Sequence, residues 1–201
     1  MSDVMAWVGL GFRHIASAAA LDHILFLLAL AAIYRLNDWR ESLLVVTAFT
    51  AGHSVTLILA VTGTLRLSTP LIEFLIPITI LVTSAENLSA YRHAISDWRR
   101  RIRPILAGAF GLVHGAGFAN YLKSLFVEDI ALPLLGFNLG IEVGQVVVLA
   151  GAGIAFAAVD RALGADRLRP VIRVPLHARA AAVSAFVALF AVRMILERAP
   201  W

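Results

Sequence analysis

Five side chains of the kind that binds transition metals lie inside long apolar segments of this sequence: Asp22, His23, His53, His114 and Glu142. Imidazole nitrogens and carboxylate oxygens without sulfur suit nickel, cobalt, zinc or manganese. A thiolate site is excluded because the sequence contains no cysteine. An ionisable side chain at membrane depth costs roughly 2.5–3.5 kcal/mol on insertion scales. Residues of this type are therefore expected to face the interior of a bundle and to have a function there.

The composition indicates what surrounds these residues. Hydrophobic residues make up 60% of the 201, charged residues only 15%, and the mean hydropathy is +0.85. A soluble domain is nearer 45–50% apolar and about 25% charged. The apolar residues come in blocks of about 20, the length that crosses a ~30 Å hydrocarbon layer. The net charge of +4 does not indicate a nucleic-acid partner, because the basic residues fall between apolar blocks, as in membrane proteins.

We therefore predict an all-α, polytopic transmembrane helix bundle that forms one domain over residues 1–201 in a lipid bilayer. The apolar blocks predict six helices, at 14–34, 42–62, 69–90, 104–124, 131–159 and 176–197. Residues 4–12 would lie in the membrane interface or add a seventh helix.

The basic residues predict the orientation. Eleven lie near or between the ends of helices on one side: Arg35, Arg40, Arg92, Arg99, Arg100, Arg101, Arg103, Arg161, Arg167, Arg169 and Arg173. Four lie on the other side: Arg13, Arg66, Lys123 and Arg198. The positive-inside rule places the richer side in the cytoplasm, so both termini are expected outside a bacterial inner membrane.

This topology places the costly side chains at one depth. Asp22, His53, His114 and Glu142 fall on four different helices, all roughly 10–16 Å below the outer surface at 1.5 Å per residue. Chance would scatter them, so we predict one site. The three other histidines, His14, His93 and His177, fall at helix ends or in loops, where we expect structural roles.

Further polar residues predict a supporting layer and a path. Asn138, Glu142 and Gln145 are spaced i, i+4, i+7 and share one helix face. Gly136, Gly140 and Gly144 lie roughly opposite, as a ridge of small residues that favours close helix packing. On the helix at 69–90, Glu73 lies near the outer end, whereas Glu86 and Asn87 lie near the cytoplasmic end, as expected of an exit path.

Four segments resemble the HupE/UreJ family of bacterial membrane proteins: DHILFLLAL (22–30), FTAGHSVTLILA (49–60), GLVHGAGFA (111–119) and FNLGIEVGQ (137–145). The likeness spans residues 11 to about 150. It implies a permease-like protein for nickel or cobalt, with metal-site positions at Asp22, His23, His53, His114 and Glu142.

We therefore predict a secondary transporter for a divalent transition metal, because no ATP-binding motif is present. Asp22 and Glu142 would neutralise the ion, the histidines would bind it, and Asn138 and Gln145 would orient the ligands. The same residues fit an intramembrane zinc-dependent hydrolase, in which Glu142 would be the general base. A membrane accessory subunit without transport of its own is the third hypothesis.

Overall fold

The computed structural model describes residues 2–18, 20–34, 36–65, 68–91, 97–125, 130–164 and 176–200. Within these ranges the chain contains helices and no strand. The α-helices are α1 (Ser2–Ala16), α2 (Leu21–Ile33), α3 (Trp39–Val61), α4 (Thr69–Tyr91), α5 (Asp97–Leu125), α6 (Ala131–Gly164) and α7 (Leu176–Glu197), and a 3-10 turn, η1 (Leu36–Asp38), precedes α3. The predicted all-α bundle is confirmed.

Five of these helices are long and apolar enough to cross a membrane, and α1 with α2 forms a sixth span if the two are counted together. The start of the first predicted helix, at residue 14, differs from the structure. A helix runs from Ser2 to Ala16, the chain bends by 68°, and a second helix begins at Leu21. No proline or glycine lies between residues 15 and 21, so local propensity does not explain the break.

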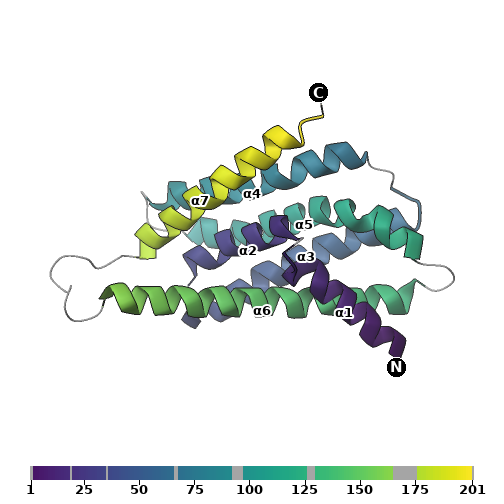
Figure 1. Cartoon of the computed structure of the whole chain (residues 1–201), viewed down its shortest axis with the longest axis horizontal. Helices are drawn as coiled ribbons and strands as arrows, with labels where there is room; N and C mark the ends of the chain where they lie inside the picture. Colours follow the sequence, from purple (N-terminus) through teal and green to yellow (C-terminus); the bar gives the residue numbers. More distant parts are fainter. Residues whose placement is uncertain are drawn as a thin grey trace.

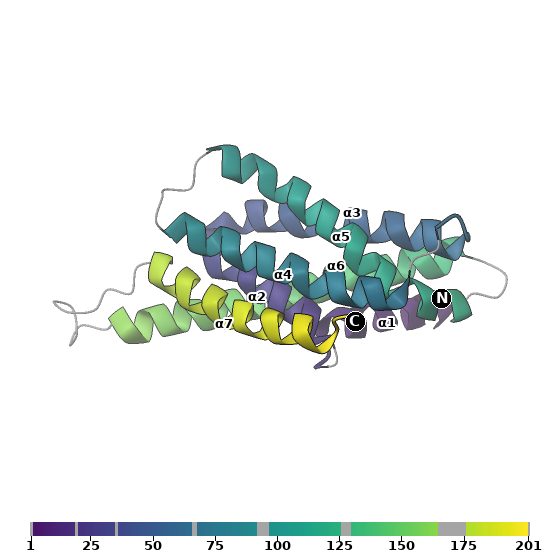
Figure 2. The same cartoon turned by 90° about the horizontal axis from the view of Figure 1, so that it is seen from above.

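The helices associate in three close pairs, α3 with α5, α1 with α6, and α4 with α7. Figure 1 shows α4 and α7 along one side and α6 along the other, with α2 between them; Figure 2 shows the same bundle from above. Nine of the 13 residues of α2 are buried, so this short helix is the centre of the bundle. The start of α1 and the end of α7 lie toward the same end of the bundle (Figure 1).

Glycines set the distance between paired helices. A Cβ at Gly140 would lie 2.1 Å from the carbonyl oxygen of Val8, so only glycine allows α6 to approach α1 this closely. A Cβ at Gly115 would lie 2.4 Å from the carbonyl oxygen of His53, which is the same situation between α5 and α3. Without a strong hydrophobic force between helices in lipid, such backbone contacts are what packs them. The ridge predicted on α6 is therefore an α1 contact surface.

One arginine fixes the C-terminal end of α2. Arg179 of α7 is only 9% exposed, and it donates hydrogen bonds to the carbonyl oxygens of Ala32 and Tyr34 at 3.4 and 3.0 Å. It also pairs with the carboxylate of Asp160 on α6. The last carbonyls of a helix have no partner within the helix, so this side chain supplies one.

Candidate metal centre

Three histidines from three helices meet inside the bundle. His14, His23 and His53 each offer a ring nitrogen, and these nitrogens lie within 4.8 Å of one another. Three imidazole nitrogens that each lie about 2.1 Å from one first-row metal are at most roughly 3.6 Å apart, the spacing of a trigonal arrangement. The nitrogens would therefore have to approach one another by up to about 1.2 Å to close around an ion.

The break between α1 and α2 brings the first two histidines together. His14 and His23 are nine residues apart, which in a continuous helix is about 13.5 Å along the axis. Across the break their ring centroids are 4.7 Å apart. His14 lies in the last turn of α1, whose unpaired carbonyls give that end partial negative charge. Broken helices with a terminus at membrane depth are a common way to build an ion site.

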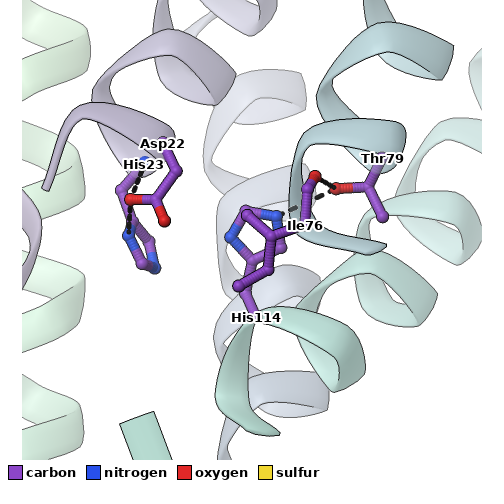
Figure 3. Close-up of polar contacts among 5 residues, drawn as sticks. All are labelled: Asp22, His23, Ile76, Thr79 and His114. Atoms are coloured by element: carbon purple, nitrogen blue, oxygen red, sulfur yellow. Dashed lines mark hydrogen bonds and ion pairs between the residues drawn. The ribbon is translucent and has the colours of Figure 1, made fainter. Parts of the chain in front are cut away.

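Asp22 orients His23 and does not belong to the group of three ligands. Its Oδ1 lies 3.0 Å from Nδ1 of His23 and accepts the backbone N–H of His23 at 2.9 Å (Figure 3). Nδ1 then carries the proton, and Nε2 of His23 is left as the ligand atom. That Nε2 is buried, with no hydrogen-bond partner among the described residues. A carboxylate behind a histidine fixes the ring and raises its basicity toward a metal.

His53 is the most deeply buried of the three histidines. It is fully buried, and neither of its ring nitrogens has a hydrogen-bond partner within the described part of the chain. A buried polar atom without a partner is unfavourable by about 1–3 kcal/mol, so coordination of an ion by the His53 ring would relieve part of this cost.

His114 lies beside the group and has its own anchor. Its Nε2 is 2.9 Å from Oγ1 of Thr79, and that hydroxyl donates to the carbonyl oxygen of Ile76 (Figure 3). Because the single hydroxyl proton is used there, the hydroxyl accepts from Nε2–H, and the free electron pair of His114 is on Nδ1. The ring centroid is 5.1 Å from that of His23. His114 therefore lies next to His23 but outside the three nitrogens grouped within 4.8 Å.

Aromatic rings surround the histidines. Phe118 packs on His14 with centroids 4.0 Å apart and stacks on Phe137 at 5.2 Å. Phe49 packs against His114 at 5.1 Å, and Phe26 stacks on Phe49 at 4.9 Å. These rings exclude water and strengthen the interaction of an ion with its ligands.

A cavity of about 490 Å³ leads to the group. His14, Asp22, His23 and His114 line its deep end. Residues of the predicted outer side line its mouth, namely Arg13, Glu73, Tyr121 and Arg198. Glu73 is exposed, as expected of a residue near the outer end. An ion can therefore reach three of the five predicted metal positions from this end.

The residues predicted on α6 lie differently. Gln145 is 1% exposed and accepts a hydrogen bond from Thr50 of α3 at 2.9 Å. Asn138 is half-buried, and its Oδ1 has no partner among the described residues. Glu142 is half-buried, and its carboxylate is not among the three ligand atoms grouped within 4.8 Å. Its role as a ligand stays a prediction.

Glu86 and Asn87, the two residues predicted near the cytoplasmic end of α4, both have side-chain partners. Asn87 donates to the carbonyl oxygen of Ala29 at 2.8 Å and to Ser184 at 3.1 Å. Glu86 pairs with Arg103, which the sequence had placed among the cytoplasmic topology signals. The side chains of His93 and His177 lie outside the described part of the chain.

Sequence reasoning missed His14, Thr79 and Arg103. The expected structural role of His14 follows from its place at a helix end, but the helix that ends there stops inside the bundle. Its proximity to the Asp22–His23 pair was the one signal available.

Comparison with known proteins shows the family to which the chain belongs. The family described as HupE / UreJ protein matches residues 1–197, which is nearly the whole chain. No curated protein and no solved structure gives a significant match.

Proposed function

Since the chain belongs to the HupE/UreJ family, we propose that it is a permease for a divalent transition metal such as nickel or cobalt. The observation that carries the proposal is the group of His14, His23 and His53 nitrogens within 4.8 Å, two of which, His14 and His23, also line a cavity of about 490 Å³. The association of the family with nickel and cobalt supports the choice of substrate.

The ligand chemistry supports the same substrate class. Three neutral imidazoles suit Ni²⁺, Co²⁺ and Zn²⁺, whereas Mg²⁺ and Ca²⁺ prefer oxygen. Asp22 supplies the negative charge behind His23. The affinity order alone does not choose among these metals, because the site selects by geometry and by what the cell supplies.

The direction of access follows from the cavity. It reaches the histidines from the end that holds Arg13 and Arg198, which the positive-inside rule places outside a bacterial inner membrane. At the opposite end of the bundle, two ion pairs join neighbouring helices: Arg179 with Asp160, and Arg103 with Glu86. This arrangement fits a carrier that is open to the outside, and uptake is the direction we propose.

The test is metal uptake and metal binding with the same variants. Cells that express the protein should accumulate radioactive Co²⁺ or Ni²⁺, and His53→Ala should abolish the accumulation. His53 has no hydrogen-bond partner to lose within the described residues, so the change leaves no polar group unpaired; it removes the ligand together with ring contacts to Phe49 and Phe137. His93→Ala, in a predicted loop, is the matched control and should behave as wild type. Accumulation by the His53→Ala protein equal to wild type would overturn the proposal.

A metal-dependent hydrolase is the second candidate. Three histidines can hold Zn²⁺ with an open position, and a cavity of about 490 Å³ is the size that accepts a small molecule. The carboxylate expected as general base, Glu142, is not grouped with these histidines, whereas the permease keeps a second expected carboxylate, Asp22, next to His23; this difference favours transport. Purified protein in liposomes separates the hypotheses, since a permease moves Co²⁺ alone, a hydrolase turns over a substrate, and an accessory subunit does neither.

A further inference from the structure

A second polar cluster lies on the other side of the histidines. A small cavity of about 20 Å³ is lined by Thr83, Glu86 and Asn87 of α4 and by Arg103 of α5. This volume holds about one water molecule or one small ion. All four side chains come from the half of the bundle predicted to face the cytoplasm.

A polar stripe connects the two sites. Thr79, Thr83 and Asn87 are spaced i, i+4, i+8, so they follow one face of α4 over about 12 Å. Thr79 is the residue bonded to His114, and Thr83 donates to the carbonyl oxygen of Thr79 at 2.9 Å. The ring of Phe26 separates the sites, because it lines the small cavity and its centroid is 5.8 Å from that of His114.

The atoms that this cluster offers as ligands to a cation are oxygens. Asn87 is 2% exposed. Its Oδ1 has no hydrogen-bond partner in the part of the chain that is described. A carboxylate, an amide oxygen and hydroxyls are the ligands of a hard or partly hydrated cation.

Arg103 already provides a positive charge at this position. It is 5% exposed, its Nε donates to Oε1 of Glu86 at 3.1 Å, and its Nη2 is buried without a partner among the described residues. Tyr34 is close enough to Arg103 for the two side chains to interact. Burial raises the pKa of the Tyr34 phenol, and the charge of Arg103 acts in the opposite direction. A guanidinium and a divalent ion cannot both be neutralised by one carboxylate in a buried site.

We propose that the cavity between Glu86, Asn87 and Arg103 is a second cation site on the transport path, and that Arg103 occupies Glu86 until the ion arrives. The proposal rests on the proposed permease function. The histidines first bind the ion from the outside. The ring of Phe26 then moves aside, and the ion reaches the oxygen ligands of the second site as the Arg103 guanidinium moves away from Glu86. A weaker, oxygen-lined site next to the cytoplasm then releases the ion.

The test counts bound Mn²⁺, which prefers oxygen ligands, on the purified full-length protein by electron paramagnetic resonance. Arg103→Gln removes the positive charge that is paired with Glu86, so this variant should bind one more Mn²⁺ than the double variant Glu86→Gln/Arg103→Gln. Equal Mn²⁺ binding by the two would overturn the proposal. Arg193→Gln, which breaks an exposed Arg–Glu pair with Glu197, is the control and should bind as wild type.

A second measurement covers the case in which Arg103→Gln does not fold. Glu86→Gln alone should lower Co²⁺ uptake at least tenfold, with Co²⁺ binding to the histidines kept within about twofold of wild type. Uptake equal to wild type would contradict the proposal. Failure of the permease function itself looks different, because then the wild type takes up no Co²⁺ while the Mn²⁺ count still decides whether the second site exists.

Discussion

Replacing Gly115 with alanine should open the metal centre without touching a ligand. The new Cβ would lie 2.4 Å from the carbonyl oxygen of His53, against 3.4 Å or more in an ordinary contact. The α3 and α5 backbones must therefore separate by about 1 Å at the position of His53. This shift displaces His53 relative to His14 and His23, whose nitrogens already lie up to 4.8 Å away and must come within roughly 3.6 Å of one another to share one ion.

The expected result is a site with two histidines in place of three. Loss of an outer partner of a ligand already weakens metal binding about 10–100-fold, so loss of a ligand should exceed 100-fold, or about 2.8 kcal/mol at 1.4 kcal/mol per tenfold. Titration of the purified protein with Co²⁺, followed by its visible absorption, measures this directly.

Gly108→Ala is the matched control on the same face of α5. Its Cβ would lie 3.4 Å from the carbonyl oxygen of Ala48, an ordinary contact, so affinity for Co²⁺ should stay within about threefold of wild type. Equal Co²⁺ affinity of the Gly115→Ala and Gly108→Ala proteins would refute the argument that backbone contact between α3 and α5 places His53.

Three further predictions test other parts of the molecule. Asp22→Asn keeps the shape beside His23 but removes the charge, and Co²⁺ affinity should fall about 10–100-fold in the same titration; an unchanged affinity would contradict the orienting role. Arg179→Gln leaves buried carbonyl oxygens unpaired and should lower the free energy of unfolding by about 2–4 kcal/mol, whereas Arg193→Gln, which breaks an exposed pair, should leave it unchanged, both measured by denaturation in detergent. A cysteine at Arg66 should react with an impermeant reagent added outside cells and one at Arg100 should not; labelling of residue 100 would reverse the proposed orientation.

The apolar blocks determined most of the fold in advance. Lengths near 20 residues predicted the spans that became α3 to α7, because backbone groups in lipid must be satisfied within each segment. The cost of ionisable groups in lipid likewise predicted that Asp22, His23, His53 and His114 gather inside the bundle. The glycine ridge on α6 was readable too, because three glycines four residues apart can only form one line on a helix.

Tertiary structure alone decided how the site is built. The break before α2 could not be predicted, because no proline or glycine lies there. It places His14 beside His23 and so makes His14 a candidate ligand. Arg103 looked like one basic residue in a run, and only the packing of α5 on α4 shows that it lies against Glu86. The sequence by itself determined which side chains must avoid lipid, since that cost belongs to each residue. Which of them share an ion depends on distances of a few ångströms between helices, and those distances are set by backbone contacts such as the one at Gly115.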